Sequence, residues 1–216
     1  MDQSATLSDL PADQRRRARM VRDHLTEGTD QRVIAAMAAL PRHDFVAPGL
    51  RGSAYDDAPL AIGCGQTISQ PRVVGRMLTL LGLSPGMNVL DVGGGSGYAA
   101  ALIARLVAPG HVVAVERQAG LIAQARIALA RHAPHVELIH GDGLDAAPTR
   151  SFDVIHVACA CSEPPVALCA RLHDHGVLIA PVGPHDGQQQ LMRFSRHGLG
   201  EVLDDVWFVP ALRGLA

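Results

Sequence analysis

Apolar runs alternate with helical patterns through the part of the chain that follows residue 72. The runs that read as strands cover residues 88–92, 111–116, 136–140, 152–157 and 177–182. Between them, apolar positions spaced by three and four predict helices at 73–81, 98–106, 121–133 and 165–172. Continuously apolar strands that alternate with helices are typical of an α/β fold with a doubly wound, mostly parallel sheet. Two closing strands, at 189–195 and 206–210, are expected to run antiparallel.

The first 71 residues follow a different pattern. Residues 1–14 are polar and predict a loose leader, and helical patterns follow at 14–25 and 31–40. Thr29 or Asp30 can cap the second helix, and Pro41 follows its end. Prolines and glycines recur from 41 to 71 and predict an ordered loop without regular structure. No repeat or linker divides the chain, so residues 1–216 are expected to form one domain.

Composition narrows the class of protein. A chain of 216 residues with 48% apolar and 19% charged residues has the makeup of a globular domain with an ample core. The net charge of −2 gives no global field for nucleic acid or an anionic membrane. No apolar run reaches membrane-spanning length. The four cysteines are too few for a disulfide scaffold, which predicts a reduced, cytoplasmic protein.

Acidic residues and glycines follow three successive predicted strands. Asp91-x-Gly93-x-Gly95-x-Gly97 ends the first, Glu116 ends the second, and Gly141-Asp142-Gly143 follows the third. Ligands of doubly wound sheets bind at these strand ends. Gly95-x-Gly97-x-x-Ala100 also fits a dinucleotide-binding pattern, so the glycine turn alone leaves that alternative open. An acid at position 91 would repel a pyrophosphate and favours a cationic ligand.

A second polar segment lies upstream, at Gly65-Gln66-Thr67-Ile68-Ser69-Gln70-Pro71. Glycine lets the backbone approach a ligand closely, and Thr67 and Ser69 offer hydroxyls. Pro71 restricts the backbone conformation where the segment ends. This composition is typical of a pocket wall. The alternative for Ser69 is a helix cap before Val73.

With these two segments in this order, the chain resembles the protein-L-isoaspartate O-methyltransferase family of class I methyltransferases. The resemblance runs from about Met20 to Leu212. Supporting segments are Arg32–Met37, Pro41–Val46, Phe152–Ala158, Leu178–Gly183 and Phe208–Pro210. It implies a Rossmann-like fold and S-adenosylmethionine as cofactor. It also implies methylation of the free carboxylate of L-isoaspartyl residues in damaged proteins and peptides, which initiates repair through a succinimide.

The resemblance also assigns roles to matched positions. Ser69 would be the catalytic residue, and residues 1–71 would form part of the acceptor site. The cofactor would be bound by Thr67, Ile68, Ser69, Asp91, Gly93, Gly95, Glu116, Asp142 and Gly143. The substrate would be bound by Ser69, Val209 and Pro210. Departures from the family pattern include Arg72, where a histidine or aromatic residue is usual, and Cys64 and Gly94 at more tolerant positions.

The chemistry itself needs little proton handling. The acceptor carboxylate has a reference pKa of roughly 4 and is ionised at neutral pH. Methyl transfer then requires alignment and loss of water, and a hydroxyl such as Ser69 can hold one carboxylate oxygen while the other attacks. Two alternatives are methylation of an aspartate in a dedicated peptide precursor and a non-catalytic cofactor-binding role.

Other features of the sequence predict no further chemistry. His156, Cys159 and Cys161 lie close together without the spacing of a zinc site, so no metal is expected. His156 is expected inside a buried strand, in a structural role. Cys64 has no evident partner histidine and is expected to be a small packing residue. The sequence leaves the oligomeric state open.

Overall fold

The structure, a computed structural model, describes residues 9–25, 28–145, 150–198 and 200–216. The helices are α1 (Pro11–His24), α2 (Gln31–Ala39), α3 (Pro71–Leu80), α4 (Tyr98–Val107), α5 (Ala119–His132) and α6 (Val166–Cys169), with 3₁₀ helices η1 (Arg42–Phe45) and η2 (Pro48–Ser53). The strands are β1 (Leu60–Gly63), β2 (Gln66–Ile68), β3 (Asn88–Val92), β4 (His111–Glu116), β5 (Glu137–His140), β6 (Phe152–Val157), β7 (Leu172–Val182), β8 (Gln189–Phe194) and β9 (Gly200–Val206).

The central sheet has seven strands in the order β5-β4-β3-β6-β7-β8-β9. Strands β3 to β7 are parallel, whereas β8 and β9 are antiparallel to their neighbours. The chain winds outward from β3 in both directions, so the switch point lies between β3 and β6. The expected doubly wound, mostly parallel sheet with antiparallel closing strands is confirmed.

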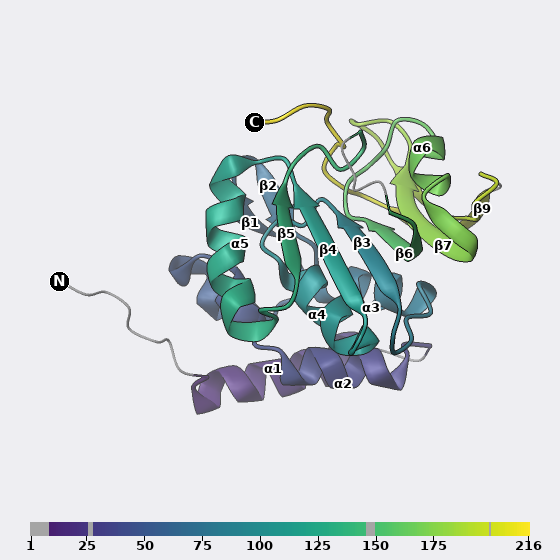
Figure 1. The fold of residues 1–216 in the computed structure, drawn as a ribbon. Coiled ribbons are helices and arrows are strands. Elements are labelled where there is room, and N and C mark those ends of the chain that lie inside the picture. The colour runs from purple at the N-terminus through teal and green to yellow at the C-terminus, as the bar shows by residue number, and fades with distance from the viewer. Residues whose placement is uncertain (1–8, 26–27, 146–149, 199) are drawn as a thin grey trace.

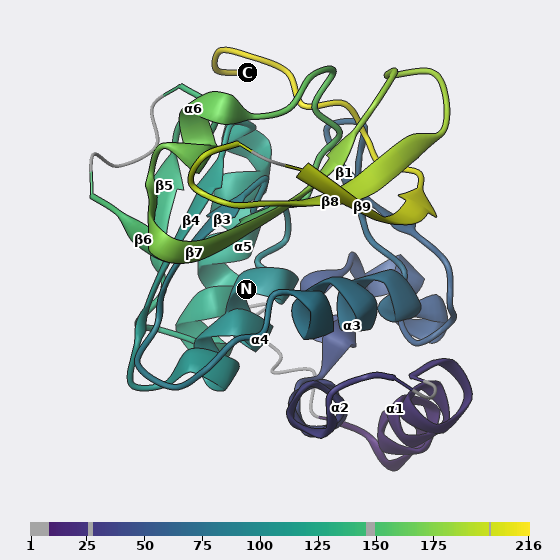
Figure 2. The same ribbon diagram turned by 90° about the vertical axis from the view of Figure 1, so that its right-hand side faces the viewer.

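Alternating residues of β3 face opposite sides of the sheet. Val89 packs into the core that includes residues of α2 to α5, and Leu90 packs into the core that includes residues of α6. By the same alternation Asp91 lies on the side of Val89. Figure 2 shows α3 and α4 between the sheet and the outer pair α1 and α2. The C-terminal segment crosses the edge where the parallel strands end (Figure 1).

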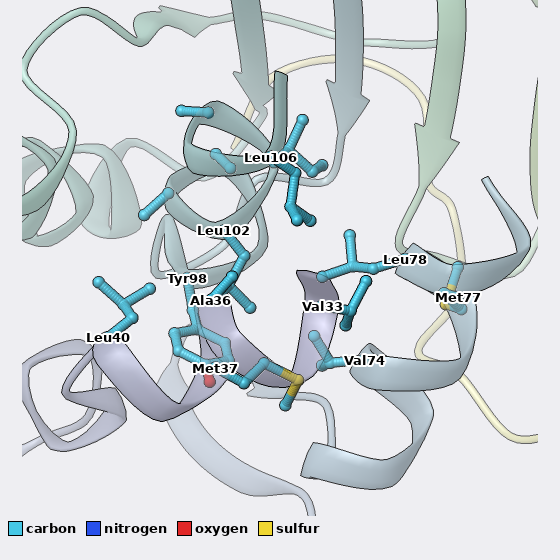
Figure 3. Packing of buried hydrophobic residues seen from close by; sticks show 14 of the residues in the cluster. Val33, Ala36, Met37, Leu40, Val74, Met77, Leu78, Tyr98, Leu102 and Leu106 are labelled. Carbon is cyan, nitrogen blue, oxygen red and sulfur yellow. The ribbon is translucent and has the colours of Figure 1, made fainter. Parts of the chain in front are cut away.

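Helix α2 joins the N-terminal region to the rest of the core. Asp30 caps the helix, because its carboxylate accepts a hydrogen bond from the backbone N–H of Arg32 at 2.7 Å. The fully buried Met37 and Leu40 point toward α3 and α4 together with Val33 (Figure 3). Burial of each such side chain stabilises the fold by about 1.5–3 kcal/mol. Helix α3, which follows Ser69, is therefore held against the core by α2.

The prediction of a loop over residues 41–71 is wrong in part. The segment contains η1, η2 and the hairpin β1–β2. Its two-residue turn, Cys64-Gly65, has positive φ at both positions (52° and 69°). Turns of this kind usually contain Asn-Gly or Asp-Gly, so the sequence signal for a hairpin is missing. Cys64 is exposed, which contradicts its expected packing role.

Three other differences from prediction exceed the shifts of one or two residues seen at the remaining element ends. The last strand covers Gly200–Val206 and not 206–210, since Phe208 N–H instead donates to the Gln189 side chain at 2.8 Å. The helix expected at 165–172 is confined to α6, and β7 already begins at Leu172. Residues 11–14, expected in the leader, belong to α1, and residues 1–8 lie outside the described chain.

Candidate active site

Two hollows lie at the edge where the parallel strands end, and they share Gly93. The first, of about 470 Å³, is bordered by Glu116, Asp142 and Gly143. The second, of about 490 Å³, is bordered among others by Thr67, Ile68, Ser69 and Gly95. The structure therefore brings together the strand-end acids and the upstream hydroxyl segment, which lie far apart in the sequence.

Glu116 is 5% exposed and holds the glycine turn in place. Its Oε2 accepts a hydrogen bond from Gly95 N–H at 2.9 Å, and its Oε1 accepts one from Gln118 N–H at 2.8 Å. Glu116 is thus a buried carboxylate that supports the turn, and not a surface charge. Each carboxylate oxygen has a further lone pair, so Glu116 can still accept hydrogen bonds from ligand hydroxyls in the first hollow.

Asp142 both forms a turn and fastens the C-terminal segment. Its Oδ1 accepts from Leu144 N–H at 2.9 Å, as in an Asx turn, and its Oδ2 accepts from Gly214 N–H at 2.6 Å. Arg117 Nε donates to the carbonyl of Gly214 at 2.7 Å. The C-terminal segment therefore closes one side of the first hollow, which sequence reasoning did not predict.

The glycine turn brings bare backbone to both hollows. Gly93, Gly95 and Gly97 have φ of 82°, 53° and 85°, values that residues with side chains rarely adopt. A Cβ at Gly97 would lie 3.0 Å from Leu129 Cγ, so the turn also packs closely on α5. Helix α4 begins directly afterwards, at Tyr98.

Ser69 lies between the end of β2 and the start of α3. It borders the second hollow and a third one, of about 360 Å³, with Val73 and Trp207. Its hydroxyl has no hydrogen-bond partner among the described residues. The residue before α3 is Gln70, and the backbone N–H of Arg72 in the first turn is satisfied by Asp57. Ser69 is therefore not the helix cap, and its hydroxyl is available to a ligand.

The two residues of the closing segment that were predicted to bind substrate with Ser69 border different hollows. Val209 borders the third hollow together with Ser69, and its carbonyl accepts a hydrogen bond from Ala160 N–H at 2.8 Å. Pro210 borders the first hollow instead. Of the pair, Val209 is thus the residue that the structure brings to the serine.

Asp91 lies beneath the site and not in its wall. It is fully buried, and it is not among the described residues that border the three hollows. Its Oδ1 lies 2.7 Å from Nδ1 of His156, which does border the second hollow. Sequence reasoning placed His156 in a buried strand and missed this position. A signal was present, since a histidine among the apolar residues at the end of this strand is unusual.

The sequence pattern of the family described as protein-L-isoaspartate(D-aspartate) O-methyltransferase matches residues 15–215. The chain belongs to this family. A protein-L-isoaspartate O-methyltransferase of Bradyrhizobium sp. (strain ORS 278) is 46% identical over 193 residues, which cover 87% of this chain and 89% of the relative. One of Methylorubrum extorquens (strain PA1) is 46% identical over 92% of this chain and 89% of its own length.

Solved structures of the family share the fold. A protein-L-isoaspartate O-methyltransferase of Plasmodium falciparum, in complex with S-adenosyl-L-homocysteine, superimposes with a TM-score of 0.80. The match covers 93% of this chain and 98% of that one, at 26% identity. Family, fold and cofactor agree with the expectations from sequence. The chain is an S-adenosylmethionine-dependent methyltransferase that acts on isoaspartyl residues.

The described residues show neither a cluster of metal ligands nor a helix that could span a membrane. They contain no group of three or more histidine, cysteine or acidic residues that could hold a metal ion. Within the same ranges, no helix is long and apolar enough to cross a membrane.

Proposed function

We propose that the two adjoining hollows divide the cofactor between them. The nucleoside occupies the first, where Glu116 accepts from the ribose hydroxyls and Asp142 from the adenine amino group. The methionine part and the sulfonium occupy the second, beside Thr67, Ile68 and Ser69. The observation that carries this proposal is the shared Gly93, because a single extended ligand can pass from one hollow to the other along bare backbone.

The methyl group is transferred by in-line displacement. One carboxylate oxygen of the isoaspartyl residue forms a bond to the methyl carbon as the bond from carbon to sulfur breaks, and S-adenosylhomocysteine leaves. The Ser69 hydroxyl donates a hydrogen bond to the other oxygen and so aims the attacking one. The carboxylate is already ionised, so the step needs orientation and exclusion of water, but no base.

The acceptor is a residue of a damaged protein or peptide. Supporting this, the third hollow continues from Ser69 to the exposed side chain of Trp207, which leaves room for a chain on either side of the reacting residue. Residues 1–71 supply Thr67 and Ser69 and hence one wall of the acceptor site. In the methyl ester that results, a backbone nitrogen of the substrate displaces methanol and forms a succinimide. Hydrolysis of the succinimide returns part of it to aspartate.

The proposal also covers the cellular compartment and the kind of partner. All four cysteines are free, which supports work in the reducing cytoplasm. The small net charge of −2 gives no basis for a nucleic-acid partner.

Three matched peptides test the function. They differ only in carrying isoaspartate, aspartate or asparagine at one position, and each is incubated with the enzyme and S-adenosylmethionine labelled in the methyl group. We expect base-labile label on the isoaspartyl peptide alone, followed by methanol release and a rise in the aspartyl form. Equal labelling of the aspartyl peptide would instead favour the alternative of a dedicated aspartyl substrate, and no labelling would refute the proposal.

A further inference from the structure

His156 and Asp91 lie on the two strands that border the switch point of the sheet. The register of β3 against β6 pairs these residues directly, so their side chains emerge side by side on one face. Nδ1 of His156 lies 2.7 Å from Oδ1 of Asp91. Ligands of doubly wound sheets bind above this point.

The carboxylate fixes which ring nitrogen carries the proton. An ionised carboxylate can only accept, so Nδ1 must donate, and in the neutral ring Nε2 is left with a lone pair. The ring is 4% exposed and borders the second hollow, and Nε2 has no partner among the described residues. An acceptor beside the hollow that has no donor in the described protein suits a ligand that donates hydrogen bonds.

We propose that His156 is a cofactor-binding residue, whose Nε2 accepts a hydrogen bond from the ammonium group of the methionine part. This inference rests on the proposed placement of the cofactor. Among the polar groups of the methionine part, the ammonium is the hydrogen-bond donor. The carboxylate has no hydrogen to donate and would be repelled by the lone pair on Nε2 of His156. Asp91 acts through the histidine as a positioning residue. Its buried charge also attracts the cationic ligand, which gives this acid a role although it does not border the hollow.

The test compares two ligands on matched variants. One ligand is S-adenosylhomocysteine, and the other is its analogue with hydrogen in place of the amino group, which keeps the carboxylate. Dissociation constants are measured by calorimetry without peptide. Because hydrogen bonds to charged groups are stronger than neutral ones, the unaltered protein should prefer the amino ligand by about tenfold or more. In His156→Phe this preference should largely vanish, and KM for S-adenosylmethionine should rise more than kcat falls.

Two further variants distinguish loss of the hydrogen bond to the ligand from a structural effect of the substitution. His156→Gln retains a side-chain acceptor and should keep part of the preference, whereas His156→Leu should lose it; this pair also replaces His156→Phe if that variant fails to fold. His111→Phe, at the exposed start of β4, is the matched control and should keep the full preference. If the variants without an acceptor keep the preference, or weaken both ligands equally, the inference is overturned. Methylation of the isoaspartyl peptide by the unaltered enzyme would still support the proposed function in that case.

Discussion

The carboxylate of Asp57 accepts a hydrogen bond from the backbone N–H of Arg72 at 2.9 Å, and its other oxygen lies 3.3 Å from Nε of the same residue. Asp57 precedes the β1–β2 hairpin, and Arg72 opens the helix that follows Ser69. The contact thus closes a loop around the segment that holds Ser69 and caps α3 from outside the helix. The departure from the family pattern at position 72 is accommodated by this ion pair.

Replacement of Asp57 should loosen this loop. Asp57→Ala leaves the first turn of α3 without its acceptor, which should lower the free energy of unfolding by about 0.5–2 kcal/mol. It should also lower kcat/KM for the isoaspartyl peptide, because Ser69 loses its fixed position. Chemical denaturation and methylation kinetics measure the two effects. Asp56→Ala, at the exposed neighbouring position, is the control, and equal behaviour of the two variants would contradict the capping role.

Removal of the Ser69 hydroxyl should affect turnover and spare cofactor binding. Ser69→Ala should reduce kcat by roughly 10²-fold, the loss typical of a reacting group that is misaligned. The dissociation constant of S-adenosylhomocysteine should change little. Steady-state kinetics and calorimetry give the two values, with Ser84→Ala in an exposed turn as control. Unchanged kcat would rule out positioning by this hydroxyl.

A neutral side chain at position 116 should weaken cofactor binding. In Glu116→Gln, the amide NH₂ must face Gly95 N–H or Gln118 N–H, two donors that the carboxylate now accepts from. The mismatch should lower the free energy of unfolding by about 1–3 kcal/mol and reduce the rise in melting temperature on addition of S-adenosylhomocysteine. Glu137→Gln removes a charge from an exposed position and should keep the ligand-induced rise. If both variants respond alike, the specific role of Glu116 is disproved.

Stability should fall on mild acidification because of His43. Burial lowers the pKa of His43 below its ordinary value of 6.5. Between that value and the lower folded pKa, the unfolded chain binds more protons, so the free energy of unfolding declines as the pH falls below about 6.5. His43→Gln removes this contribution and should show a flatter decline over the same range. Denaturation curves at several pH values test this, and the exposed His173→Gln should keep the original slope.

The central strands could be predicted because each is buried on both faces. The bounds of β3, β4 and β6 agree with the apolar runs in the sequence. Strand β9 was misplaced for the opposite reason. It lies at the edge of the sheet and carries Glu201, Asp204 and Asp205, so no apolar run marks it. Edge strands often carry charges of this kind, which prevent pairing with other chains.

Those site residues that lie at the ends of strands or in turns could be named from the sequence. Glu116 and Asp142 follow predicted strands, and Ser69 lies in a segment with a recognisable composition. The partnership of Asp91 with His156 was not predictable, since it depends on which strands are neighbours. Strand order is set by the packing of the whole sheet, and the two residues lie 65 positions apart.

The position of Gly93, where the two hollows meet, has a consequence for the selection of ligands inside a cell. A side chain there would be strained at φ +82° and would bring its Cβ to 3.4 Å from Cys159 Sγ. Under the proposed placement of the cofactor, free adenosine and free methionine can each fill only one of the two hollows and gain only part of the binding energy. The intact molecule gains both parts at the entropic cost of a single association, as a bivalent ligand does. Abundant metabolites that resemble one half of the donor are thereby poor competitors.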